Sequence, residues 1–106
     1  MIPRDPTNPA YVFIPEELVD KIPALYSTEN AADPIAVLKF FTPDSSWSWF
    51  LIEADIEQRV AFGLVIGHER EFGYFSLAEL ESIRGPMGLP IERDLHFEPT
   101  PVSACQ

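Results

Sequence analysis

The densest group of chemically versatile side chains is the tetrapeptide His68-Glu69-Arg70-Glu71. One imidazole and two carboxylates could bind a metal ion or share acid and base roles. Their spacing matches no specific ligand motif, and a charged turn between two strands has the same composition. We therefore predict no metal and no cofactor. A small metal-dependent or accessory enzyme remains an alternative if folding brings Glu92 and Asp94 close to this turn.

Other candidate catalytic motifs are incomplete. Ser45, Ser46 and Ser48 lack the Gly-x-Ser-x-Gly context that exposes a nucleophile, and they suit a turn. Gly63-x-x-x-Gly67 lies in a β-rich run with no Lys-Ser/Thr after it, so it is not a phosphate loop. Small residues there favour close approach by a packed helix. The sequence predicts no catalytic residues and a non-enzymatic protein.

Trp47 and Trp49 alternate along one β-rich run, and Leu51 and Glu53 follow at the same period. Period two places all four on one face of a strand. The opposite face is also apolar, so the pattern does not say which face is core. Burial of both indoles is favoured. An exposed pair would instead form a binding patch, as expected of a scaffold or assembly subunit.

Charge is the strongest bulk property of the chain. Its 106 residues include 17 acidic and 7 basic side chains, for a formal net charge of −10. This surface repels phosphate backbones, so we expect a basic protein partner and no direct binding of nucleic acid. Acidity also serves solubility alone. The candidate contacts are the acids expected in turns and on a helix's polar face, namely Glu53, Asp55, Glu57, Glu69, Glu71, Glu79 and Glu81.

Cysteine usage and hydropathy indicate the compartment. Cys105 is the single cysteine, which rules out an internal disulfide and agrees with a reducing environment. No apolar run reaches the length of a membrane span, and the first residues lack the pattern of a signal peptide. We expect a cytoplasmic protein that does not contact a membrane.

β-rich runs and turns dominate the middle of the chain. Runs over 36–42, 47–54, 60–67 and 72–75 are separated by turn residues, which predicts an antiparallel meander of about four strands. Residues 95–97 alternate like a further edge strand, and 91–94 suit one helical turn.

Two helices are expected on a face of this sheet. Pro15 and an apolar stripe predict a short helix over 14–22. Ser76 and Glu79 form a capping box, which predicts a second helix ending before Gly85. The expected fold is a small single α+β domain over 13–98, with two or three short helices, a Pro-rich tail over 1–12 and a C-terminal tail over 99–106.

Several segments together resemble one family. They are Leu25-Tyr26-Ser27-Thr28-Glu29-Asn30, Lys39-Phe40-Phe41-Thr42-Pro43, Trp47-Ser48-Trp49-Phe50, Gly73-Tyr74-Phe75-Ser76-Leu77-Ala78-Glu79-Leu80 and Gly88-Leu89-Pro90-Ile91-Glu92-Arg93-Asp94. Over about residues 13–100 the chain is similar to the small bacterial proteins catalogued as domain of unknown function 2958. Phe13-Ile14-Pro15 departs from the usual start of the first helix in that family.

The resemblance transfers no reaction, cofactor or active-site residue. It implies a setting on plasmids and other mobile elements, near conjugation, methylation and anti-restriction genes. Together with the charge, this favours an acidic protein-interaction module that modulates a nucleic-acid-handling host protein. DNA mimicry in anti-restriction or another anti-defence role would present carboxylates where phosphates sit.

Overall fold

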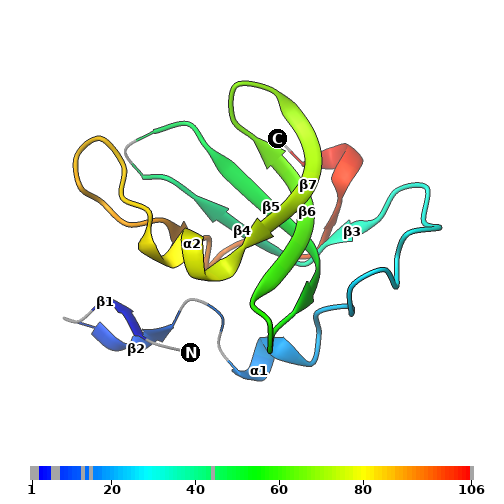
Figure 1. Ribbon diagram of the computed structural model, residues 1–106, viewed down its shortest axis with the longest axis horizontal. Coiled ribbons are helices and arrows are strands. Elements are labelled where there is room, and N and C mark those ends of the chain that lie inside the picture. Colours follow the sequence, from blue (N-terminus) through cyan, green and yellow to red (C-terminus); the bar gives the residue numbers. More distant parts are fainter. Residues whose placement is uncertain (1–2, 6–7, 13, 15, 44, 106) are drawn as a thin grey trace.

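A computed structural model describes residues 3–5, 8–12, 14, 16–43 and 45–105 of the chain. Five strands form its main sheet, which is antiparallel throughout and has the order β7-β6-β5-β4-β8 (Figure 1). These strands are β4 (Leu38–Phe41), β5 (Ser48–Asp55), β6 (Val60–Ile66), β7 (Arg70–Ser76) and β8 (Glu92–Arg93). The four longer ones fall where the sequence predicts β-rich runs.

Smaller elements complete the described chain. Two short antiparallel ladders pair β1 (Pro3–Asp5) with β2 (Asn8–Val12), and β3 (Ile35–Ala36) with β9 (Thr100–Pro101). The helical segments are α1 (Glu16–Val19), α2 (Leu77–Ser82) and the 3-10 turn η1 (Val102–Ala104).

The predicted α+β class is wrong, because the chain is mostly β and its main sheet has five strands. The predicted helix over 14–22 retains only the four residues of α1. A helix of one turn gains little from its own hydrogen bonds. After Val19 the chain forms turns, in which the Lys21 and Ile22 N–H groups donate to the Leu18 and Val19 carbonyls at 3.0 and 3.2 Å. The expected helical turn at 91–94 instead supplies β8, since Glu92 and Arg93 pair with Phe41 and Phe40 of β4. Long-range pairing overrides local propensity in so short a segment.

The two ends of the chain also differ from the expected tails. At the N-terminal end, Pro3–Asp5 and Asn8–Val12 pair as the ladder of β1 and β2. At the other end, Val102 and Cys105 are buried, and the Val102 N–H donates to the Pro34 carbonyl at 2.9 Å. The Arg70 guanidinium donates to the carbonyls of Val102 and Cys105 at 2.7 and 2.6 Å. These contacts fasten the C-terminal segment to the start of β7.

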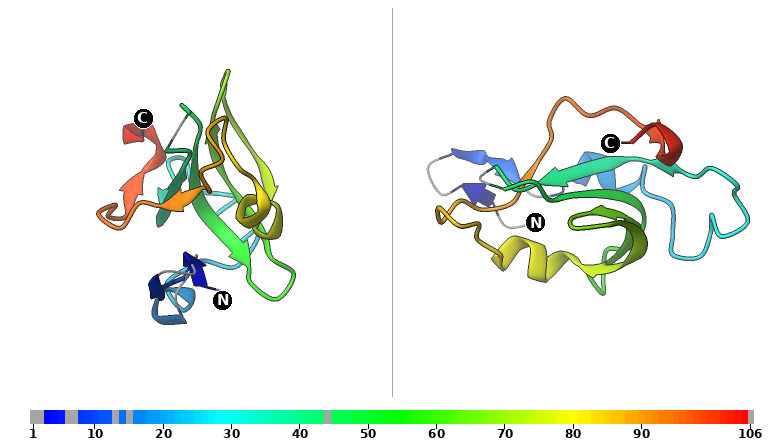
Figure 2. Two further views of the ribbon diagram at one scale, coloured as in Figure 1. Left: turned by 90° about the vertical axis from the view of Figure 1, so that its left-hand side faces the viewer. Right: turned by 90° about the horizontal axis from the view of Figure 1, so that it is seen from above.

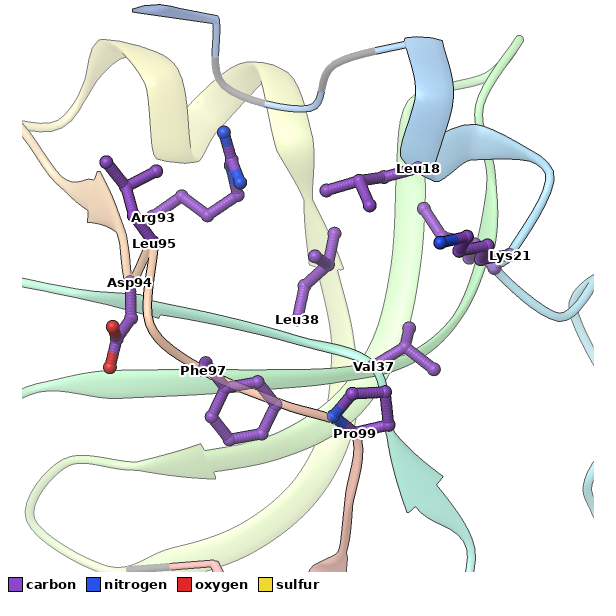
Figure 3. A pocket seen from close by; sticks show the side chains of 10 residues that line it. Leu18, Lys21, Val37, Leu38, Arg93, Asp94, Leu95, Phe97 and Pro99 are labelled. Atoms are coloured by element: carbon purple, nitrogen blue, oxygen red, sulfur yellow. The ribbon is translucent and has the colours of Figure 1, made fainter.

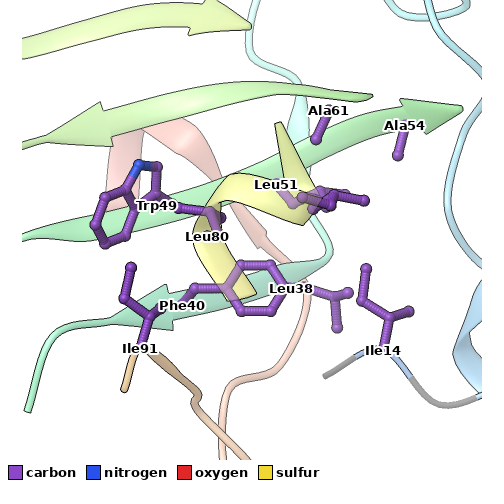
Figure 4. Close-up of a cluster of buried hydrophobic side chains, with 10 residues drawn as sticks. Ile14, Leu38, Phe40, Trp49, Leu51, Ala54, Ala61, Leu80 and Ile91 are labelled. Carbon is purple, nitrogen blue, oxygen red and sulfur yellow. The ribbon is translucent and has the colours of Figure 1, made fainter. Parts of the chain in front are cut away.

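Apolar side chains cover both faces of the sheet. The first face carries a cluster capped by Leu77 and Leu80 of α2 (Figure 4). The second face carries a smaller cluster capped by Val102 and Cys105. Figure 2 shows α2 and the C-terminal segment on opposite sides of the sheet. The central strand β5 is therefore buried on both faces, which explains why its sequence is apolar at successive positions.

A β-bulge interrupts the pairing of β5 with β6. Leu51 pairs with Gly63, whereas Glu53 pairs with Phe62, so Ile52 is the extra residue. A one-residue insertion moves every following side chain to the opposite face. Glu53 therefore lies on the second face, away from Trp49 and Leu51, and the prediction that period two keeps all of them on one face is wrong.

Gly63 in β6 and Gly67, the residue after β6, leave room for a neighbouring strand and for an indole. A Cβ atom added at Gly63 would lie 1.9 Å from the Phe50 carbonyl oxygen of β5. One added at Gly67 would lie 2.4 Å from the Trp47 ring. The expected close approach is real, but a packed helix does not cause it.

The predicted N-terminal cap of α2 at Ser76 is confirmed. Ser76 is the N-cap residue, and its Oγ accepts a hydrogen bond from the Glu79 N–H at 3.1 Å. We expect Ser76→Ala to lower the free energy of unfolding by about 1 kcal/mol, because one helical N–H loses its acceptor. Urea unfolding measures this. Ser82→Ala is the control, and equal stability of both variants would contradict the capping role.

Candidate functional site

Among the residues that the structure describes, Glu53 carries the one buried carboxylate. It is 3% exposed, and the loop before β3 surrounds it with donors. The backbone N–H groups of Tyr26 and Thr28 donate to its two oxygens at 2.7 and 2.8 Å, and the Thr28 hydroxyl donates to Oε2. The bulge in β5 thus aims a carboxylate at a loop some 25 residues earlier. Charge-assisted hydrogen bonds of this kind hold the loop against the sheet.

The carboxyl of Glu53 is ionised at neutral pH. Burial acts to raise its pKa, but the hydrogen bonds from Thr28 and from the Tyr26 backbone outweigh burial and leave the pKa below the usual glutamate value. A full negative charge therefore lies beneath the loop.

Aromatic rings gather next to this charge. Phe62 of β6 pairs with Tyr74 of β7, and their ring centroids are 5.0 Å apart at 56°. Phe72 stacks on Phe62 with centroids at 6.2 Å, and Tyr26 approaches Tyr74 at 6.4 Å and 57°. Tyr26, Phe72 and Tyr74 are 61%, 53% and 57% exposed. The cluster formed by Tyr26, Phe62, Phe72 and Tyr74 is called the aromatic cluster below.

The aromatic cluster and Glu53 line one pocket of about 310 Å³. The loop that carries Tyr26 also contributes Thr28, Glu29 and Pro34 to the lining. The pKa of the Tyr74 phenol is raised by partial desolvation, by Tyr26 and by the negative charges of Glu53 and Glu29. The two carboxylates are therefore close enough to the Tyr74 phenol to oppose its ionisation.

The other predicted acidic contacts do not form one cluster. Asp55 and Glu57 lie at the turn between β5 and β6, where the Asp55 carboxylate accepts the Gln58 N–H at 3.1 Å. Glu69 and Glu71 lie at the far end of the β6–β7 hairpin. Such a hairpin spans roughly 20 Å. The predicted acids are therefore spread along the hairpin, and Glu53 is apart from them because it is buried.

Glu79 and Glu81 lie on α2, beside the turn between β5 and β6. Glu79 is exposed, whereas Glu81 is half-buried and forms an ion pair with Arg59 at 2.7 Å. Arg59 has a positive φ of 58°, and its carbonyl accepts the Leu77 N–H at 2.8 Å. Glu81 therefore helps to attach α2 to the turn.

The two tryptophans are part of the first apolar cluster. Trp49 is buried, and Trp47 is half-buried and stacks on it with ring centroids 5.9 Å apart. The His68 ring packs edge-on against Trp47 at 5.5 Å. Both indoles thus serve mainly to pack the sheet.

The residues of the alternative metal site are far apart in the sheet. Glu71 is on β7 and Glu92 is on β8, which are opposite edges of the five strands. Neighbouring strands lie about 4.8 Å apart, so four steps separate these edges. Among the described residues no three His, Cys, Asp or Glu side chains form a metal-binding group.

A second hollow of about 360 Å³ lies between α1 and the chain around residues 93–99 (Figure 3). Leu18, Val37, Leu38 and Phe97 supply its apolar lining. Lys21, Arg93 and Asp94 add charges of both signs, so the hollow has no single electrostatic preference.

Sequence reasoning missed the aromatic cluster. Phe72 and Tyr74 alternate on β7 and face Leu64 and Phe62 across the hairpin, so the register of the turn at 67–69 would have revealed their shared face. Tyr26 gave no such signal, because it joins the cluster through the contacts of a loop.

The fold and the site together define a small, mostly β domain with an aromatic pocket built over a buried carboxylate. The chain belongs to the family described as "Protein of unknown function (DUF2958)", which matches residues 13–104. The comparison with curated proteins gave no match, and neither did the comparison with solved structures. Across the described residues, no helix has the length and apolar character that crossing a membrane requires.

Proposed function

We propose that this protein is an acidic, non-enzymatic interaction module that binds a basic, nucleic-acid-handling protein of the host cell. The observation that carries the proposal is the exposed aromatic cluster beside the carboxylates of Glu29 and Glu53, on a chain with a net charge of −10. Exposed aromatic side chains are typical of binding hot spots, and an acidic surround favours basic partners.

The form of action proposed is competition with nucleic acid. Carboxylates along the β6–β7 hairpin would occupy the partner's basic channel in place of phosphates, as an anti-restriction or other anti-defence protein does by DNA mimicry. Such a partner is cytoplasmic in bacteria, so the proposal places this protein there. The exposed acids Glu57, Glu69 and Glu71 supply charges at both ends of the hairpin.

Affinity capture from the native host, followed by mass spectrometry, tests the proposal. A basic nucleic-acid-binding protein should be recovered, and duplex DNA should displace it competitively. Affinity should fall steeply between about 0.05 and 0.2 M salt, since charge pairs are screened over about 10 Å. A partner whose binding ignores salt and DNA would contradict mimicry.

Charge reversal at one end of the hairpin should slow association. We expect Glu69→Lys with Glu71→Lys to lower the association rate constant by roughly tenfold and to change the dissociation rate constant less, because dispersed charges act mainly on steering. Stopped-flow kinetics with the captured partner measures both rates.

The control for this pair is Glu92→Lys with Glu98→Lys. It changes the net charge equally, and Glu92 lies on the opposite edge strand. Equal slowing by both pairs would show that overall charge, and not the hairpin, directs binding.

A further inference from the structure

The pocket at the aromatic cluster combines angled aromatic rings with a buried carboxylate. Its walls are rings set at steep angles, 56° between Phe62 and Tyr74 and 57° between Tyr26 and Tyr74. One lining residue is the ionised, 3% exposed carboxylate of Glu53. Rings at such angles form two sides of a cage, and Phe72, which stacks on Phe62 at 14°, continues the Phe62 side.

The backbone holds one of these rings in place. Tyr26 has a φ of 70°, a left-handed conformation that non-glycine residues seldom adopt. Its N–H donates to Glu53 at 2.7 Å, so the buried carboxylate fixes the backbone that carries the ring. Strain of this kind persists only where the surroundings hold it. Tyr26 is thus presented to solvent by a defined contact.

Charge decides which ligand suits the pocket. An uncharged apolar ligand would gain from the rings but nothing from Glu53 and Glu29. A cation gains from both, because the face of an aromatic ring attracts positive charge and the carboxylates add to that attraction. A guanidinium group is planar, stacks on aromatic faces and donates in a fork to carboxylates, which an ammonium group does not do.

We propose that this pocket receives an arginine side chain of the basic partner, with the guanidinium group among Tyr26, Phe72 and Tyr74 and within reach of Glu29. This inference rests on the proposed function and names the group of the partner that is recognised. Glu53 accepts three hydrogen bonds from the loop. Glu53 therefore attracts the guanidinium group through its negative charge without bonding to it, and the exposed Glu29 contacts the guanidinium group directly.

The test compares two peptides that differ only in charge. One is a short flexible peptide with a single arginine, and the other carries citrulline, the neutral isostere of arginine, at the same place. Titration of the isotope-labelled full chain, followed by amide and aromatic NMR signals, should give saturable shifts at Tyr26, Phe72 and Tyr74 with the arginine peptide. The citrulline peptide should bind about fivefold or more weakly. Equal binding of both peptides would overturn the proposal.

Exposed positions provide variants that keep the fold. Phe72→Leu and Glu29→Gln should each lower the affinity for the arginine peptide by roughly three- to tenfold. Glu92→Gln is the matched control for Glu29→Gln, since both glutamates are exposed and Glu92 lies on the far edge strand β8. An unchanged amide spectrum outside the pocket verifies folding. If Glu29→Gln and Glu92→Gln bind the arginine peptide with the same affinity, the pocket does not recognise the cation.

Two further probes identify the source of the cation. Tetramethylammonium chloride tests for a free small cation, and a lysine peptide tests for an ammonium side chain. We expect both to bind more weakly than the arginine peptide, and tighter binding of either would overturn the assignment to arginine. Capture of a basic partner that binds Phe72→Leu and wild type equally would reject the pocket while leaving the proposed function intact. If the arginine peptide binds but no basic protein is captured, the proposed function fails and the pocket stands.

Discussion

Gly63→Ala is expected to destabilise the domain more than any other single-methyl change, by at least about 3 kcal/mol, and to unfold a large share of the molecules at 37 °C. The added Cβ would meet the Phe50 carbonyl oxygen at 1.9 Å and the Leu51 Cα at 3.2 Å. Both are backbone atoms of the central strand β5, so no side-chain rotation relieves the clash. The two strands would have to separate at the bulge.

Gly73→Ala is the matched control, because Gly73 pairs directly with Gly63 across the hairpin. A Cβ at Gly73 meets nothing within 4 Å. Alanine there should leave stability unchanged or raise it slightly, since glycine is unfavourable inside a strand. Urea unfolding of both variants measures the difference. Similar effects of both substitutions would contradict the close approach of β5 to Gly63.

The sequence was sufficient to place the central strands and one helix start. The alternation of large and small residues from 60 to 67 and the turns on either side predicted β6 and its neighbours, and Ser76 predicted the cap of α2. These are local signals, and each depends on residues close together in the chain. The family resemblance over about residues 13–100 is likewise confirmed, by a match to 13–104.

The sequence could not reveal features that depend on distant pairing. β8 consists of two residues held by β4, and β9 consists of two residues held by β3, so neither has a periodic pattern of its own. The C-terminal segment looked like a tail because Pro99 and Pro101 exclude a helix and a central strand. Arg70 nevertheless binds two of its carbonyls.

The position of the candidate site was mispredicted because of one extra residue in β5, Ile52. Strict alternation from Trp49 to Glu53 assumed an unbroken strand, and the bulge at Ile52 reverses the face of everything after it. Glu53 was expected to be an exposed contact because acids near turns usually face outward, whereas it is buried under the loop that carries Tyr26. A bulge costs one ladder hydrogen bond and leaves no clear sequence signature, so the pocket could not be foreseen.

Glu53→Leu should lower the free energy of unfolding by about 3 kcal/mol or more, the largest effect expected of any change to a contact between a loop and the sheet. The change removes the acceptor of three donors: the N–H groups of Tyr26 and Thr28 and the Thr28 hydroxyl. Each unsatisfied buried donor costs about 1–3 kcal/mol, moderated where the loop opens to water. Thr28→Val removes the hydroxyl alone and should cost about 1 kcal/mol. Equal losses for both variants would show that the hydroxyl alone matters.

Acid should remove the difference in the free energy of unfolding by which the wild type is more stable than Glu53→Gln. The folded protein holds the pKa of Glu53 below its usual value, so the folded state binds this proton less readily than the unfolded state. The stabilising contribution is therefore complete above the unfolded glutamate pKa, and it is lost as pH falls through the lower, folded pKa. Glutamine cannot titrate, and the other acidic groups contribute equally to both proteins. Urea unfolding at a series of pH values should show the stability difference between the two proteins shrinking as pH falls, whereas a constant difference would mean that the ionised carboxylate does not hold the loop.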